Sequence, residues 1–426
     1  SLQQVIWGAA ISCLILFAYS LTASYVGAYT GLNFSLLSQH TFGVNGSKFV
    51  SACQTFLFLL WYAMIAVFIA EAVKGLFPSA FPIEIVAAVA ALLMAANNLF
   101  GFAGVANFAR YIAAPVLIAW ISFVFAKAAC ATPHTVLAQA GSADFTHAVS
   151  LISSFVIGYS VWGNEPDFWR FGRPEIGATA WPLALAIAFG QIVFPITGWL
   201  LAALSGITDQ SSAAALVNNY AFNGFPAIAA IVLAVTYFAT GDANLYGAIN
   251  AVQNFRSTPR RRLVIEIMMI TAVCAAIMTR NPKAFETLAS FNAVLLPCVM
   301  LIIAVNFLLF KKTVEAAQSR HVVWNSLIPV LAAWAVGIVT AGVLPGTDRF
   351  HCGIWPLYAW LTGVSLYIVL HFTVTLPLPR KSAKQPVAVL SNPDLVLSNS
   401  DLVLSNSDPV LSDPAIEQAV LDPDLS

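Results

Sequence analysis

The stretch SSFVIGYSVWGNEPDFWRFGR at residues 153–173 decides the fold of this chain. It begins as an apolar helix, passes the small residues Gly158, Ser160 and Gly163, and ends in a dense group of polar and charged side chains. Such a helix cannot satisfy all its backbone groups internally, and in a bilayer the break survives only inside protein or against a cavity. Broken helices of this kind form substrate and ion sites in secondary transporters. The rest of the chain can be interpreted as the frame around this break.

The composition excludes a soluble globular domain. The chain is 59% hydrophobic and 9% charged, with no net charge, whereas charged residues make up roughly a quarter of a soluble domain. The lack of a basic surplus argues against nucleic acid as a partner. Neither the cysteines nor the histidines have metal-ligand spacing, and zinc, nucleophile-elbow and phosphate-loop motifs are missing. We therefore expect no enzyme chemistry, no metal site and no cofactor; the cysteines, interpreted as small apolar residues, are Cys13, Cys53, Cys130, Cys274, Cys298 and Cys352.

The hydropathy pattern predicts eleven membrane-spanning helices, since a bilayer requires roughly 20 apolar residues per crossing. The third and fourth spans come from one long apolar run, which we divide at NNLFG, residues 97–101, because a polar pair followed by glycine suits a turn. The predicted spans are residues 5–29, 49–70, 83–100, 103–128, 145–163, 178–204, 225–252, 263–279, 285–310, 322–344 and 354–374.

Basic residues set the expected orientation of the chain in a cell's inner (plasma) membrane. They cluster after the fifth, seventh, ninth and eleventh spans, so every second loop is expected to be cytoplasmic. The intervening loops at 131–144 and 206–223 contain no Lys or Arg. This places Ser1 outside and the tail inside, and it leads us to expect that one further helix precedes the chain. The basic clusters are Arg170 and Arg173, Arg256 and Arg260 to Arg262, Lys311 and Lys312, and Arg380, Lys381 and Lys384.

The sequence changes character after residue 376. A seven-residue near-repeat, VLSNPDL followed by VLSNSDL and VLSNSDP, runs through residues 388–414. Ser, Asn, Asp and Pro disfavour helices, so we expect a disordered tail, with a docking motif as the alternative. The expected organisation is a transmembrane transporter domain at 1–376 and a disordered cytoplasmic tail at 377–426.

Four motifs together resemble the nucleobase:cation symporter-1 (purine-cytosine permease) family. GYSVWGNEPDFWRFG at 158–172 is similar to the family's sixth-helix signature, and TGDANLY at 240–246 to the eighth-helix motif of its cytosine permeases. YVGAYTGLNFSLLSQHTFGVNGS at 25–47 resembles the segment that closes the second helix, and Trp61-Tyr62 matches an aromatic pair of the third. The resemblance covers residues 5–375. It implies an all-α integral membrane protein with the leucine-transporter-like five-plus-five inverted repeat and twelve helices, of which this chain would contain helices two to twelve.

The resemblance also implies a function. It predicts a secondary active transporter that carries a nucleobase-like heterocycle, cytosine or a related pyrimidine or purine, together with Na+ or H+ by alternating access. The expected partners are therefore a small heterocyclic substrate, a monovalent cation and the lipid bilayer. One alternative is a truncated, non-transporting remnant or substrate sensor of the same family. Another is an intramembrane hydrolase, which would need paired intramembrane carboxylates or a Ser/His arrangement.

The candidate substrate ligands cluster at the helix break and on the second span. A planar heterocycle needs an aromatic face and a few placed hydrogen-bond partners. The resemblance implies that Trp61 stacks on the ring and that Ser160 lies at the substrate, although small residues also serve helix packing. Trp162 can stack or face lipid, and Gly163 leaves room and free backbone groups. Some hydantoin-transporting members have glutamine where this chain has Ile65, which favours a smaller, pyrimidine-like ligand.

Asp242 is the strongest single candidate for a functional residue, because a carboxylate inside the membrane is energetically costly and usually faces the interior of the helix bundle. It could bind substrate amines, carry a proton or assist a cation, or it could be a hydrogen-bonded structural acid. One turn earlier, Thr236, Ala239 and Thr240 share one helix face. The resemblance implies that these positions bind sodium, and Ala239 lacks the expected side-chain oxygen.

Asp167 and Arg170 lie three residues apart at the expected cytoplasmic end of the broken helix. At this spacing they can pair, cap the helix or gate the pathway. We favour a structural or gating role over contact with the substrate.

Cysteine labelling tests the predicted orientation. In a variant whose native cysteines are replaced by serine, Ser142→Cys should react with a membrane-impermeant maleimide from outside intact cells. Thr258→Cys should react only after permeabilisation, because residue 258 lies within a basic loop. The reverse pattern would contradict the orientation and the preceding helix inferred from it.

Overall fold

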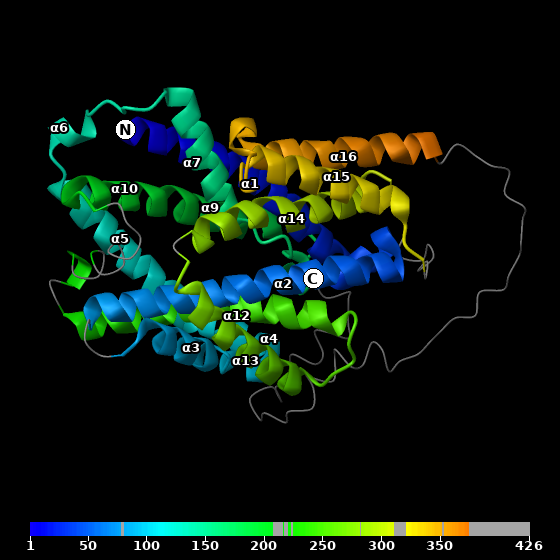
Figure 1. Cartoon of the computed structure of the whole chain (residues 1–426), viewed down its shortest axis with the longest axis horizontal. Helices are drawn as coiled ribbons and strands as arrows, with labels where there is room; N and C mark the ends of the chain where they lie inside the picture. The colour runs from blue at the N-terminus through cyan, green and yellow to red at the C-terminus, as the bar shows by residue number, and fades with distance from the viewer. Residues whose placement is uncertain are drawn as a thin grey trace, which may run out of the picture. The chain divides into compact units, whose positions relative to one another are not determined.

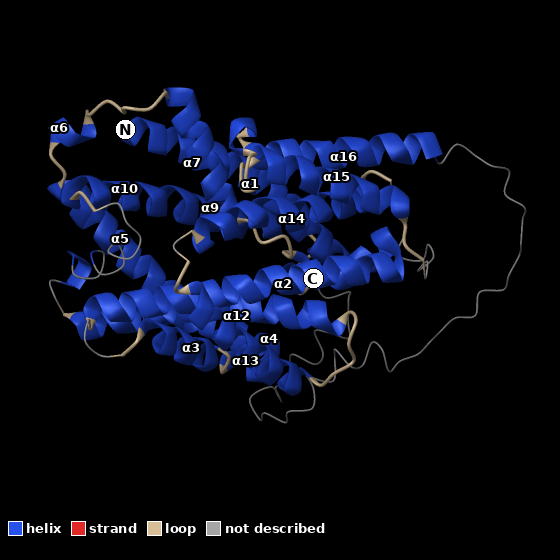
Figure 2. Ribbon diagram, in the orientation of Figure 1, coloured by secondary structure: helices blue, strands red, loops and turns tan. Residues whose placement is uncertain are grey.

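The computed structural model describes residues 1–77, 81–207, 216, 220–222, 225–281, 283–310, 321–351 and 353–374. Across these residues the backbone is helical apart from short connections, and it contains no strand (Figure 2). The predicted tail at 377–426 and its repeat lie outside the described residues, as do Lys311, Lys312 and Cys352. The described backbone agrees with the all-α class expected from the sequence.

Each of the eleven predicted spans coincides with a helix or with helices joined end to end. Within the described residues, seven helical segments are long and apolar enough to cross a membrane, and α7 and α15 are shorter apolar helices. The helices are α1 (Leu2–Thr30), α2 (Phe34–Leu76), α3 (Ile83–Met94), α4 (Gly101–Phe108), α5 (Ala114–Ala131), α6 (His134–Leu137), α7 (Phe145–Ser160), α8 (Pro166–Trp169), α9 (Ile176–Ala188), α10 (Phe194–Ser205), α12 (Pro226–Gln253), α13 (Arg260–Met278), α14 (Ala284–Leu308), α15 (Trp324–Thr340) and α16 (Trp355–Val374).

The helices run side by side in two groups (Figure 1). In the first group α2 packs against α3, α12 and α13, and α3 also packs against α13. In the second group α1 packs against α7 and α9, and α14 packs against α7, α15 and α16. The groups touch through α2 and α14. The broken stretch at residues 153–173 therefore lies in the second group and faces helices of the first.

The long helix α2 is two helices joined at Gly43. Gly43 has φ 75° and ψ 166°, a left-handed conformation that glycine adopts without the strain a Cβ would cause. Asn33 caps the first of the two helices by accepting a hydrogen bond of 2.8 Å from the Leu36 N–H. The hydropathy pattern predicts the second part as the span 49–70 and does not predict the short helix that precedes the kink.

The third and fourth spans are separated where the sequence predicts a turn. A 3-10 turn, η1 (Asn97–Phe100), follows α3. Gly101 then takes φ 70° and ψ −153°, a conformation in which a side chain would be strained. Asn98 is completely buried in this turn. The two asparagines therefore end the helix. Asn98 is also buried inside the protein, whereas the polar residues of a surface loop are usually exposed to solvent.

Two spans contain a π-helical turn that ends two residues before a proline. η2 (Ala109–Ala113) precedes Pro115, and η3 (Phe189–Val193) precedes Pro195. Proline removes an N–H donor and clashes with the carbonyl one turn earlier, and a widened turn accommodates both effects. Beyond these turns α5 and α10 pack together around their own apolar cluster, separate from the main core. The pair α5–α10 therefore follows two matching irregular turns, and it packs on the rest of the bundle through α12 and α1.

Candidate functional site

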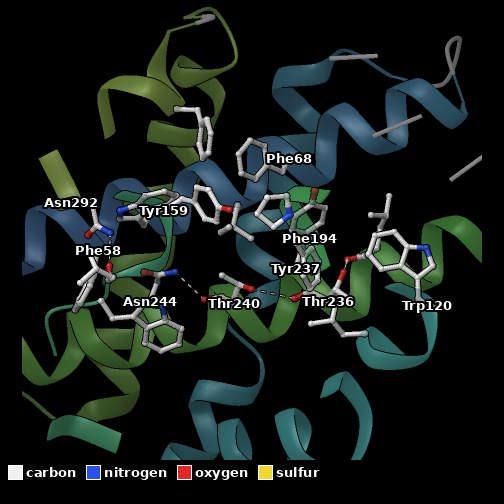
Figure 3. Close-up of a pocket in the computed structure, with 18 residues that line it drawn as sticks. Phe58, Phe68, Trp120, Tyr159, Phe194, Thr236, Tyr237, Thr240, Asn244 and Asn292 are labelled. Carbon is white, nitrogen blue, oxygen red and sulfur yellow. Dashed lines mark hydrogen bonds between the residues drawn. The ribbon is translucent and has the colours of Figure 1, made fainter. Parts of the chain in front are cut away.

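A cavity of about 570 Å³ lies between α2, α5, α7, α10, α12 and α14 (Figure 3). This volume is within the usual range of small-molecule sites, which are mostly apolar with a few placed polar groups. Its lining residues are Phe58, Trp61, Ile65, Phe68, Leu117, Trp120, Tyr159, Val161, Trp162, Phe194, Pro195, Leu233, Thr236, Tyr237, Thr240, Asn244, Phe285 and Asn292. The cavity is thus an aromatic chamber with a small number of hydroxyl and amide groups.

The helix break predicted from the sequence forms one wall of this cavity. α7 ends at Ser160 and α8 begins at Pro166. The Asn292 side chain of α14 donates from Nδ2 to the carbonyl oxygens of Gly158, at 2.8 Å, and Val161, at 2.5 Å. These bonds satisfy backbone acceptors that the interrupted helix leaves free. α14 therefore holds the break in its irregular conformation.

Gly163 supports the break by allowing close packing and does not line the cavity. It has φ +82°, and a Cβ at this position would lie 2.2 Å from the Leu296 Cβ. Gly158 is similarly restricted, because an added Cβ would lie 2.6 Å from the carbonyl oxygen of Ala289. The glycines therefore bring α7 and α14 into contact, which the sequence offered as the alternative to a direct substrate role.

Trp61 lies in the aromatic wall that α2 contributes. Its side chain is 7% exposed and meets Phe285 edge-on, with ring centroids 6.1 Å apart and an interplanar angle of 84°. Phe68 joins the same wall through contacts with Phe285 and Tyr237. The Trp61 indole N–H is buried and has no hydrogen-bond partner among the described residues. A buried donor without a partner is costly.

One face of α12 supplies most of the polar lining. Thr236, Thr240 and Asn244 follow one another at intervals of one turn (Figure 3). The threonine hydroxyls donate to the carbonyl oxygens of Leu233, at 3.0 Å, and Thr236, at 3.3 Å. The Asn244 Nδ2 donates to the Thr240 carbonyl at 2.9 Å. The Asn244 side-chain oxygen has no donor within the described part of the chain, so it can accept a hydrogen bond from a ligand.

The structure brings together some of the sequence-predicted ligands and separates others. Trp61 and Trp162 line the cavity, as do Thr236 and Thr240. Trp162 is 40% exposed and lies edge-on to Phe168 with ring centroids 5.3 Å apart. Two further candidates, Ser160 and Ala239, do not line the cavity. The Ser160 hydroxyl is nevertheless buried without a partner among the described residues.

Asp242 lies on the other side of α12, away from the cavity. It is completely buried, and its carboxylate accepts hydrogen bonds from the Nδ2 atoms of Asn97, at 2.6 Å, and Asn98, at 3.1 Å. Asn98 also donates to the Asp242 carbonyl at 3.0 Å, and Arg260 donates to the Asn98 carbonyl at 3.4 Å. The structure therefore does not bring Asp242 together with the cavity-lining residues, and its carboxylate bonds to the turn between α3 and α4.

Asp167 and Arg170 do not form an ion pair in the described structure; each bonds to a different partner. Asp167 is 1% exposed and accepts from the Phe34 backbone N–H at 2.8 Å, which caps the start of α2. Arg170 donates from Nη2 to the Tyr246 hydroxyl at 3.2 Å. The Arg260 guanidinium lies 4.9 Å from the centroid of the same ring. Both residues therefore tie the end of the broken helix to neighbouring helices.

Sequence reasoning missed several lining residues. Asn244 could have been found, because it lies one turn after Thr240 and two turns after Thr236 on the same helix face. Tyr237 shares this face. Asn292 and Phe285 carry no comparable signal, since a single asparagine or phenylalanine in an apolar span is common and its partners come from distant segments.

Three comparisons with known proteins bear on this site. The sequence profile of a family described as permeases for cytosine and purines, uracil, thiamine and allantoin matches residues 1–368. A cytosine permease of Escherichia coli strain K12 is 27% identical over 377 residues, covering 85% of this chain and 82% of that protein. A cytosine permease of Escherichia coli O157:H7 has the same identity and coverage.

Among solved structures, the chain is similar to Mhp1, described as a nucleobase-cation-symport-1 family transporter. The closed conformation of Mhp1 with bromovinylhydantoin bound has a TM-score of 0.64 at 15% identity, covering 89% of this chain and 88% of Mhp1. The inward-facing conformation has a TM-score of 0.67 at 17% identity, covering 88% and 84%. At such identities the similarity concerns the fold, and it confirms the predicted all-α membrane transporter fold.

The position of Asp242 leads to a specific expectation. Asp242→Asn should lower the thermal stability of the purified protein, because an amide cannot accept from both Asn97 and Asn98 as the carboxylate does. The loss of these charge-assisted bonds should cost about 1–3 kcal/mol, measured as a fall in melting temperature. Ligand affinity of the folded variant should be unchanged.

The matched control is Glu175→Gln, which changes an exposed carboxylate that makes no capping bond. It should leave the melting temperature unaltered. Unchanged stability of Asp242→Asn together with loss of ligand binding or uptake would show that the carboxylate acts on the ligand or ion after all.

Proposed function

The chain belongs to the family of permeases for cytosine and purines, uracil, thiamine and allantoin, and from this premise we propose that it carries cytosine or a closely related nucleobase by cation-coupled symport. The family is one of transporters, in agreement with the prediction that the chain is a multi-pass membrane protein and not an enzyme. We also propose that the protein resides in the inner (plasma) membrane with its tail in the cytoplasm. This part of the proposal rests on the basic residues in every second loop.

The observation that carries the proposal is the aromatic cavity beside the broken helix. Flat heterocycles stack on aromatic rings, and the cavity offers Trp61, Trp162 and further rings from six helices. Nucleobases also carry ring N–H and exocyclic groups that need polar partners. The free Asn244 oxygen suits an amino or ring N–H donor.

A small pyrimidine suits this chain better than a substituted hydantoin. Ile65 is an apolar lining residue, 4% exposed, at the position where some hydantoin-transporting members of the family have glutamine. An amide at this position would add a hydrogen-bonding group that the ligand must match. With Ile65 the polar contacts are concentrated on α12 and on the helix break, which favours a compact ring with few polar atoms.

The coupling cation is proposed to bind near the Thr236–Thr240 turn of α12. Both hydroxyls line the cavity, and hydroxyl and carbonyl oxygens are the ligands that hard cations prefer. Ala239 contributes no side-chain oxygen, so the set of ligands on this helix is smaller than the family pattern implies. Na+ and H+ therefore remain the two coupling ions to be compared experimentally.

The arrangement of the helices in two groups supports a mechanism of alternating access. The cavity walls come from both helix groups: α2 and α12 from one, and α7 and α14 from the other. Rocking of one group against the other would open the cavity to alternate sides of the membrane. The π-helical turns before Pro115 and Pro195 provide places where α5 and α10 can bend without breaking regular helix.

Uptake into proteoliposomes tests the proposal. The protein of residues 1–426 should accumulate radiolabelled cytosine when a Na+ or H+ gradient is imposed, and collapse of the coupling gradient should abolish accumulation. Labelled uracil and allantoin serve as competitors that define the ligand. Binding of cytosine without any accumulation would favour the sensor alternative, and the absence of both would refute the proposed ligand.

Trp61→Ala should weaken cytosine binding to the purified protein by roughly 5- to 150-fold, taking about 1–3 kcal/mol for the stacking of one base on an aromatic side chain. Isothermal titration would measure the affinity. Trp181→Ala is the matched control, because Trp181 is 73% exposed and does not line the cavity. Equal affinity of the Trp61→Ala and Trp181→Ala proteins would place the ligand elsewhere.

A further inference from the structure

A second hollow lies on the outer surface of the helix bundle, between α3 and α13. It is a groove of about 340 Å³. Small side chains form its floor, longer apolar side chains its walls, and one acidic and one basic residue its end. The lining residues are Ala88, Ala272 and Ala276, then Leu92, Met269, Val273 and Ile277, and finally Glu84 and Arg280.

The walls of the groove are exposed to the surroundings of the bundle. Met269 is 54% exposed, Val273 60% and Ile277 65%. For a membrane protein these surroundings are lipid hydrocarbon, so exposed apolar walls carry no cost. The alanines at 272 and 276 lie one turn apart, and they leave a trough where larger residues would make the surface flush with its neighbours.

The polar end of the groove lies where two helices meet the membrane boundary. α3 begins at Ile83 and α13 ends at Met278, so Glu84 and Arg280 lie beside each other at one end of the bundle. The Arg280 Nε is 3.5 Å from a Glu84 carboxylate oxygen, and the two side chains are 77% and 34% exposed. Such an exposed, long ion pair contributes little by itself. Both groups therefore remain accessible to a third, charged partner.

The length of the groove matches one leaflet of a bilayer. At 1.5 Å per residue, residues 84 to 92 of α3 cover about 12 Å and residues 269 to 280 of α13 cover about 16 Å. Half of a typical hydrocarbon core is about 15 Å. A chain that starts at the charged end would therefore reach close to the midplane at the other end.

We propose that this groove binds a phospholipid with a primary-amine zwitterionic headgroup, of the phosphatidylethanolamine class. One acyl chain lies along the alanine floor between α3 and α13. The phosphate binds the Arg280 guanidinium, whose planar fork matches phosphate oxygens. The ammonium donates to the Glu84 carboxylate. The lipid thereby joins α3 to α13, two helices of the group that also contains α2 and α12.

The headgroup assignment follows from the pair of opposite charges. A choline headgroup has no N–H to donate to Glu84. An anionic glycerol headgroup would satisfy Arg280 with its phosphate but brings no positive charge for Glu84, so the carboxylate would be left without a cationic partner. Of these three headgroups, only ethanolamine combines a phosphate for Arg280 with a cationic N–H donor for Glu84, which leaves the occupied site without net charge. The inference requires only that the protein resides in a membrane and is independent of what the cavity carries.

Native mass spectrometry of the purified, delipidated protein tests the proposal. An equimolar mixture of palmitoyl-oleoyl phosphatidylethanolamine, phosphatidylcholine and phosphatidylglycerol is added, and retained lipid is counted. Phosphatidylethanolamine should be retained preferentially. Arg280→Gln should lower its retention roughly fivefold, the effect expected for about one basic contact to a lipid headgroup. Glu84→Gln should abolish the preference for phosphatidylethanolamine over phosphatidylglycerol, and Ala276→Phe should lower retention of all three lipids.

Matched controls come from the same chain. Arg349→Gln removes an arginine that lies over its own neighbour Phe350 and outside the groove. Ala186→Phe enlarges an exposed alanine of α9. Both should retain lipid as the wild type does, and melting temperatures should confirm that all variants fold. Equal retention of the three lipids by the wild type, or unchanged retention by Ala276→Phe, would overturn the proposal.

Discussion

The amide of Asn292 donates hydrogen bonds to the carbonyl oxygens of Gly158 and Val161, and the helix break depends on this contact. Water is absent from the hydrocarbon region, so backbone groups freed by the break must find partners inside the protein. α14 supplies these partners from Asn292, and Gly163 lets it approach closely enough, since any Cβ there would meet Leu296. With the break held open in this way, α7 leaves room for an aromatic cavity instead of closing it with helix.

The two faces of α12, the helix opposite the break, have different roles. Thr236, Thr240 and Asn244 face the cavity. Asp242 faces away and bonds to the asparagines of the turn between α3 and α4, and Gly241 packs closely on Met94. A buried acid thus fixes the position of α12 against α3. The ligand-facing side of the same helix can then rely on neutral amide and hydroxyl groups, which are cheaper to keep beside an apolar chamber.

Hydropathy and helix breakers located the spans, the turn at residues 97–101 and the break, because each of these features is determined by local sequence. The structure places Asp242 on the side of α12 that faces away from the cavity. At about 100° per residue, Asp242 is rotated by about 200° from Thr240, whereas Asn244 is rotated by only about 40°. Thr240 and Asp242 therefore cannot face one cavity from a straight helix. The role of Asn292 and the kink at Gly43 depend on packing between distant segments, which a single sequence does not reveal.

The account rests on a heterocycle occupying the cavity beside the break. A structure of the protein determined with cytosine bound tests this most directly. The account predicts ring density within the cavity, stacked on Trp61 and within hydrogen-bond distance of the Asn244 side-chain oxygen. Ring density beside Asp242 and the turn between α3 and α4, or anywhere outside the helices that line the cavity, would contradict it.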